Sequence, residues 1–131
     1  MKRSTRFGAI ALLASWMLRV DVFAKRDPPP DVRPVERNGV IYSAPWVLIN
    51  EKTDGVHYSQ SCGYVLAREA KTQKIKWMVQ VYFIDYDRST EADVQDIWIT
   101  SLAFDHGDLV VRDEKRRTFR LDPTTLKVTR L

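Results

Sequence analysis

From Asn38 to the end of the chain, short runs of β-branched and aromatic residues alternate with turn residues. Such runs are typical of β-strands, because Val, Ile, Tyr, Trp and Thr fit a pleated, half-buried surface. Beyond residue 24, the sequence has no segment with the 3.6-residue apolar period of an amphipathic helix. The pattern therefore predicts a single all-β domain over residues 38–131.

Two long runs, 76–84 and 96–104, are apolar on both of the faces that a strand would present. This pattern favours central strands that are covered on both sides. Asn38-Gly39 and Asp54-Gly55 are turn signals of two-residue hairpins. The polar stretch 85–95 between the long runs is predicted to be a loop, in which Ser89 or Thr90 could cap one helical turn.

Residues 1–24 have the pattern of a secretory signal peptide. Three basic residues lie before an apolar run over 7–18, which is shorter than the ~20 residues that span a bilayer. Val22 and Ala24 place small residues before a cleavage point after Ala24. We therefore expect an exported protein, periplasmic or secreted; the alternative is an uncleaved N-terminus that stays in the membrane.

The stretch 25–37 holds four prolines among charged residues, so we expect an extended, solvated linker there. The chain of 131 residues, 44% of them hydrophobic, suits one globular domain. Cleavage after Ala24 would remove four bases and one acid and lower the net charge from +4 to +1. A nucleic-acid partner is therefore not expected. Stable membrane insertion of the mature chain is not expected either.

The single cysteine, Cys62, cannot form a disulfide within the chain. We interpret it as a half-buried strand residue, with pairing between chains as the alternative.

Residues 54–77 resemble one repeat of the pyrroloquinoline-quinone-like β-propeller family. Glu69 stands where the repeat usually has Asp, and Gln73 where it has Gly, which adopts a positive φ at little cost. The positions that match the repeat are Asp54, Gly55, Val56, Tyr58, Gly63, Tyr64, Ala67, Ala70, Thr72, Lys74 and Trp77.

Residues 107–128 resemble a second, weaker copy. Asp122 aligns with Glu69 and Thr125 with Thr72, while Arg130 replaces the tryptophan. Propellers need at least four blades, and this chain has room for about two. We therefore expect a small antiparallel sandwich or partly closed barrel built from propeller-blade-like hairpins; assembly with other copies is the alternative.

The resemblance implies scaffold roles for five residues rather than a quinone site. The acids and hydroxyls would bond turn amides, and the tryptophan would pack between sheets. No quinone-binding residue of the family can be carried over, and no cofactor is expected. The five residues are Glu69, Thr72, Trp77, Asp122 and Thr125.

The acidic loop 85–96 has oxygen-bearing residues at the alternate spacing of a calcium loop. However, Thr90 replaces the required glycine, and strands rather than helices are expected on both sides. We interpret the stretch as a solvated acidic loop, with calcium binding as the alternative. The candidate metal ligands are Asp85, Asp87, Glu91, Asp93 and Asp96.

Charge is unevenly distributed along the second half of the chain. Residues 85–108 hold seven acids, whereas residues 112–130 hold seven bases. These charges could pair across the sheet, or they could form a surface for a charged protein or an anionic envelope polymer. No nucleophile, base and orienting group stand at a recognisable spacing around His57, Ser59 and Ser61.

We therefore expect no catalytic site, and interpret the protein as a binding or interaction module of the cell envelope. A divalent-cation-binding accessory protein and an exported enzyme of unknown reaction remain as alternatives. Self-association also stays open.

Overall fold

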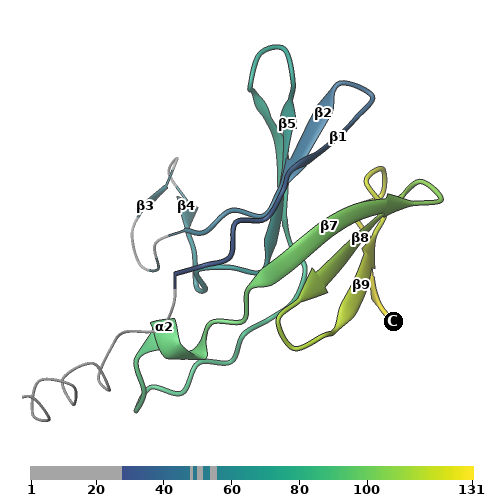
Figure 1. The fold of residues 1–131 in the computed structure, drawn as a ribbon. Coiled ribbons are helices and arrows are strands. Elements are labelled where there is room, and N and C mark those ends of the chain that lie inside the picture. Colours follow the sequence, from purple (N-terminus) through teal and green to yellow (C-terminus); the bar gives the residue numbers. More distant parts are fainter. Residues whose placement is uncertain (1–27, 48, 50–51, 54–55) are drawn as a thin grey trace, which may run out of the picture.

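The computed structural model describes residues 28–47, 49, 52–53 and 56–131. Within them the protein is all-β, with two four-stranded antiparallel sheets (Figure 1). The first sheet consists of β1 (Val35–Arg37), β2 (Val40–Ser43), β5 (Tyr64–Glu69) and β6 (Ile75–Gln80). The second consists of β7 (Ile99–Asp105), β8 (Asp108–Asp113), β9 (Thr118–Leu121) and β10 (Val128–Arg130).

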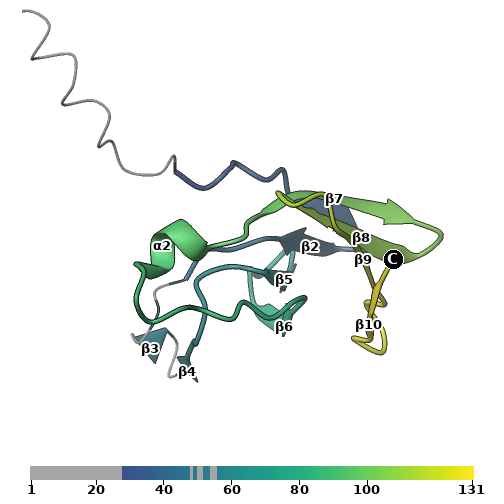
Figure 2. The ribbon, with the colours of Figure 1, turned by 90° about the horizontal axis from the view of Figure 1, so that it is seen from below.

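Each sheet is a meander in which the strands follow chain order. The hairpin of β3 (Lys52–Thr53) and β4 (Val56–His57) is inserted between β2 and β5. This hairpin and the single-turn helix α2 (Ala92–Gln95) lie at one end of the molecule, and the C-terminus lies at the other (Figures 1 and 2). The predicted all-β antiparallel fold is confirmed, and the two sheets are not closed into a barrel.

Two tight hairpins close with paired positive φ angles. Asn38 and Gly39 (φ 52° and 75°) join β1 to β2, and His106 and Gly107 (φ 50° and 85°) join β7 to β8. Positive φ at both central residues defines the type I′ turn, whose twist matches that of the flanking strands. The Asn38-Gly39 prediction is confirmed, whereas Asp54-Gly55 and the predicted signal peptide lie outside the described residues.

The β5–β6 and β9–β10 connections form the same turn, 53 residues apart. In the first, the N–H of Gln73 donates to the carbonyl of Glu69 (2.8 Å); in the second, the N–H of Leu126 donates to that of Asp122 (2.8 Å). Gln73 and Leu126 have nearly equal φ angles, 63° and 65°. The alignment of the two copies thus has a structural counterpart in these turns, with a non-glycine residue in the left-handed position of each.

One hydrophobic cluster joins the two sheets. In β8 and β9 the side chains alternate between buried and more exposed, and Leu109, Val111 and Leu121 are fully buried. Tyr42 of β2 crosses the interface: its ring centroid lies 5.3 Å from that of Phe104 in β7 and 5.7 Å from that of Trp77 in β6. The alternation of strand residues therefore supplies a core with contributions from both sheets.

The two long runs are not central strands as predicted. The first ends as a strand at Gln80, the second begins at Ile99, and both β6 and β7 lie at the edges of their sheets. β5 is the strand buried on both faces, from Tyr64 to Ala67. The first sheet also begins at β1, so the last three residues of the predicted linker 25–37 pair with β2.

Residues 81–84 leave the strand because the buried side chain of Gln60 holds them. Its Nε2 donates to the carbonyls of Cys62 and Tyr82 (both 2.8 Å), and its Oε1 accepts the N–H of Ile84 (2.9 Å). Gly63 (φ 88°) lies against this amide: a Cβ there would come within 2.8 Å of Gln60 Nε2. Val81, Tyr82 and Ile84 thus enter the core from a loop, whereas Phe83 stays exposed. We call residues 60–63 and 81–84 the Gln60 clamp.

Gln73→Gly should raise the free energy of unfolding. A left-handed conformation costs a non-glycine residue ~1–2 kcal/mol, and part of that gain is offset by the greater freedom of glycine in the unfolded chain. We expect a net increase of about 0.5–1 kcal/mol in urea unfolding. Lys71→Gly, in the same exposed turn but without a positive φ, is the control and should lower stability. An equal loss of unfolding free energy in both variants would contradict the view that the positive φ of Gln73 is costly.

Candidate functional site

A groove of about 520 Å³ lies at the α2 end of the molecule. Its walls come from residues 83–85, the segment 94–97 and the β8–β9 turn. Two large apolar side chains at this groove are open to solvent: Phe83 is 68% exposed and Val94 is 49% exposed. Ile84 and Ile97 add apolar surface to the lining. We call this feature the 83–97 groove.

Hydrogen bonds from both sides hold the segment that lines the groove. The hydroxyl of Tyr82 donates to the carbonyl of Ile97, and that of Tyr86 donates to the carboxylate of Asp96 (2.5 Å). The turn is attached through Glu114, whose N–H donates to the carbonyl of Trp98 (2.9 Å) and whose carboxylate accepts the N–H of Trp98 (3.0 Å). The groove is therefore formed by loops that are fixed to the two-sheet core.

A buried ion pair stabilises the β8–β9 turn, which forms one wall of the groove. Arg117 Nε lies 2.6 Å from Asp113 Oδ2, and the carboxylate side chain is fully buried. The Arg117 guanidinium lies 4.9 Å from the ring centroid of Tyr82, which stacks on Phe119 (centroids 5.4 Å apart). Asp113 also accepts the backbone N–H groups of Lys115 and Arg117 (both 3.0 Å). This network orders the turn that forms one wall of the groove.

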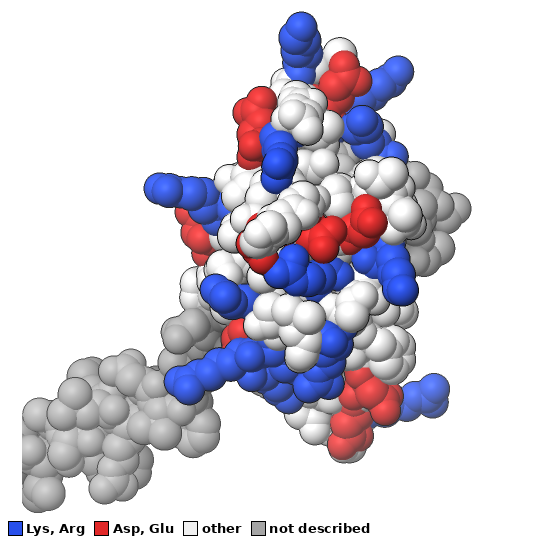
Figure 3. All heavy atoms as spheres, turned by 90° about the vertical axis from the view of Figure 1, so that its right-hand side faces the viewer, with Lys and Arg blue, Asp and Glu red and all other residues white. Residues whose placement is uncertain are grey.

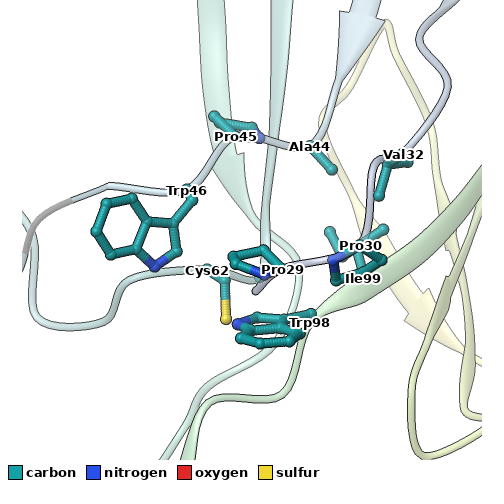
Figure 4. A pocket seen from close by; sticks show the side chains of 10 residues that line it. Pro29, Pro30, Val32, Ala44, Pro45, Trp46, Cys62, Trp98 and Ile99 are labelled. Atoms are coloured by element: carbon teal, nitrogen blue, oxygen red, sulfur yellow. The ribbon is translucent and has the colours of Figure 1, made fainter. Parts of the chain in front are cut away.

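Cys62 lies behind the groove, just before β5, and is buried rather than half-buried in a strand. Its Sγ donates to the carbonyl of Ile97 (3.2 Å) and faces a cavity of about 20 Å³. Figure 4 shows Pro29, Pro30 and Trp98 around the sulfur. Burial raises the pKa of the thiol to about 12, with the nearby Asp96 carboxylate as a further cause.

The acidic residues of the predicted calcium loop point to different partners. Asp87 Oδ1 accepts the N–H and the hydroxyl of Ser89 (3.0 and 2.8 Å), and these hydrogen bonds lower the pKa of Asp87. Asp96 is buried against Tyr86, while Asp85 and Glu91 are exposed. The Asp93 side chain is outside the described part. Among the described residues, no three His, Cys, Asp or Glu side chains are grouped as metal ligands would be.

Four of the five predicted scaffold residues lie in the two equivalent turns. Asp122 Oδ1 accepts the N–H groups of Thr124 (2.8 Å) and Thr125 (3.2 Å), and the bond from Thr124 is the main cause that lowers the pKa of Asp122. Thr125 Oγ1 accepts the N–H of Lys127 (3.3 Å). These contacts are those of an Asx-turn followed by a hydroxyl-bonded residue.

In the first turn, Thr72 Oγ1 accepts the N–H of Lys74 (3.2 Å). Glu69 is exposed and closes the turn through its backbone: its N–H donates to the carbonyl of Lys74 (2.8 Å). Glu69, whose side chain is longer, thus occupies in the first turn the position that Asp122 has in the second. Trp77, the fifth scaffold residue, packs on Tyr42 at the edge of the core.

Ser61 and His106, two residue types that often serve in catalysis, lie in different parts of the fold. His106 is in the β7–β8 turn, where its ring pairs with Asp105 (2.7 Å) and is 90% exposed. Ser61 is buried beside Tyr86, and the His57 side chain is outside the described part. Burial raises the pKa of Tyr86 to about 12, so its hydroxyl stays protonated near neutral pH and donates to Asp96.

The sequence does not reveal the groove, because the apolar run 76–84 predicts a covered strand with Phe83 near its end. No local signal marks the exposure of Phe83, because Gln60, which holds residues 81–84 as a loop, lies more than twenty positions away in the sequence. The chain matches no protein-family model and no curated protein. Within the described residues, no helix has the length and hydropathy needed to cross a bilayer.

We expect Cys62 to react very slowly with 5,5′-dithiobis(2-nitrobenzoate) in the native protein. With a pKa of about 12, its thiolate fraction at pH 8 is roughly a thousandth of that of an ordinary cysteine, and the thiolate is the nucleophile. The native rate should be at least ~100-fold below the rate in guanidinium and should rise with pH towards 12. Cys62→Ser removes the chain's single thiol and gives the blank. Fast labelling of the native protein would contradict the assigned burial.

Proposed function

We propose that the protein is an exported, non-catalytic binding module of the cell envelope whose 83–97 groove receives an apolar side chain of a protein partner. The signal-peptide pattern of residues 1–24 supports export. The observation that carries the binding function is the exposure of Phe83 and Val94 beside the same groove.

Exposed apolar side chains gain free energy when a partner removes them from water. Burial contributes ~25 cal/mol per Å² of apolar surface, and aromatic residues in recessed sites supply much of the energy of protein interfaces. Phe83 is the most exposed large apolar side chain identified in the described part of the chain. A partner residue that enters the groove would cover Phe83 and contact Ile84 and Ile97 together.

The charged residues around the groove would determine the orientation of such a partner. Asp85 and Lys115 are exposed on its lining, one on the 83–85 wall and the other on the β8–β9 turn. A segment with an apolar residue and a charge near it could pair with one of these groups at the rim, where charge contributes more to selectivity than to affinity. The fixed walls reduce the entropy lost on binding.

Phe83→Ser should weaken binding of peptides selected on this groove by about tenfold or more, because it removes the exposed ring that the peptide covers. Random peptides displayed on phage would be selected on the immobilised mature domain, and the Kd of enriched peptides measured by fluorescence anisotropy. We expect them to share an aromatic or large aliphatic residue.

Ile75→Ser is the matched control, since Ile75 is 47% exposed on β6 and does not line the groove. It should leave the Kd unchanged. Enriched peptides that bind Phe83→Ser as tightly as the wild type, or no enrichment at all, would rule out the groove as the binding site.

A further inference from the structure

The outer face of the second sheet has an arginine placed between two hydroxyl residues. The strand register pairs Ser101 of β7 with Arg112 of β8, and Arg112 with Thr118 of β9. The three side chains therefore form one row across the sheet, and all three line a hollow of about 220 Å³. An arginine flanked by hydroxyl donors is suited to an oxyanion, because each group supplies N–H or O–H hydrogen bonds.

In the neighbouring row of the sheet, the charge of the arginine is neutralised by acids, whereas the charge of Arg112 is not. Arg120 also lines the hollow, but it forms a hydrogen-bonded ion pair with Asp105 and lies 3.5 Å from Asp108. Arg112 is exposed and has no ion pair within the described residues. Of the two arginines at the hollow, Arg112 is thus the one whose guanidinium is free for a ligand.

The shape of the hollow matches a small anionic group. Ala103 and Val110 lie in the adjacent row, and both line the hollow with short side chains. A carboxylate or phosphate that enters the depression can approach the guanidinium of Arg112 from the side of the sheet. Bidentate contact between an arginine and such a group is directional as well as strong.

Further positive charge lies beside Arg112. Lys115 and Arg116 are in the β8–β9 turn, directly beyond the row, and both are exposed without an ion pair in the described part. In Figure 3, which views the right-hand side of Figure 1, Lys and Arg side chains form a group below the centre. A ligand with one anionic group would contact Arg112 alone. A chain of anionic groups would also contact Lys115 and Arg116 in the turn.

We propose that this end of the second sheet binds a linear polyanion, with one carboxylate or phosphate group seated between Ser101, Arg112 and Thr118. The neighbouring anionic groups of the polymer lie against Lys115 and Arg116. This site uses the outer face of β7–β9, away from Phe83 and Val94, and shares only Lys115 with the lining of the 83–97 groove. Of the seven bases of residues 112–130, Arg117 and Arg120 pair with acids within the fold. Three others, Arg112, Lys115 and Arg116, face the ligand.

The test measures binding of two fluorescently labelled polymers, poly-L-glutamate and inorganic polyphosphate, by anisotropy at low ionic strength. Each should bind the wild-type protein more weakly as salt rises, because counterions are released. Arg112→Gln should weaken the better-bound polymer about tenfold and make the salt dependence less steep. The polymer that loses more affinity identifies the seated group as carboxylate or phosphate.

Lys71→Gln is the matched control: it removes one exposed charge from the β5–β6 turn of the other sheet. It should change the affinity less than twofold. Ser101→Ala with Thr118→Val keeps the net charge and should also weaken binding, which a purely non-specific attraction would not produce. The proposal is overturned if neither polymer binds, or if Arg112→Gln and Lys71→Gln lower the affinity equally. Urea unfolding of each variant confirms that the fold is retained.

Discussion

The fold depends on one buried amide. Gln60 uses both of its Nε2 hydrogens and its Oε1 to bond three backbone groups, at Cys62, Tyr82 and Ile84. A buried amide without these hydrogen bonds would carry the full free-energy cost of desolvation. The three backbone groups are therefore held in the positions that satisfy it. Because Tyr82 is held in this way, its ring stacks on Phe119 of the second sheet. The clamp between residues 60–63 and 81–84 thus fixes how the second sheet docks.

The two proposed binding surfaces follow from different parts of this scaffold. The 83–97 groove is formed by the loop that leaves the clamp, and its apolar residue Phe83 is exposed because its neighbours Tyr82 and Ile84 are drawn into the core. The hollow around Arg112 follows from strand register alone, since alternation directs Leu109, Val111 and Asp113 inwards and leaves the side chains between them outside. A change in the loop would therefore affect the groove and leave the hollow unchanged.

The sequence was informative where local chemistry decides the structure. Asn38-Gly39 identified a hairpin because both residues tolerate positive φ, and the alignment of Glu69 with Asp122 matched two turns with the same hydrogen bonds. It failed at residues 81–84, whose apolar pattern is that of a strand although Gln60, a residue more than twenty positions away, holds them as a loop. The row around Arg112 could not be predicted either, because it depends on the register of three strands.

Native-state hydrogen exchange at the amide of Ile84 tests most directly whether the clamp joins the two sheets. This N–H lies in a loop, outside any strand, and donates to Gln60 Oε1. If the clamp opens only when the whole domain unfolds, Ile84 should exchange with the same free energy as the core amides of Leu109 and Val111. Exchange of Ile84 in fast local openings, while the β8 amides stay protected, would contradict the account.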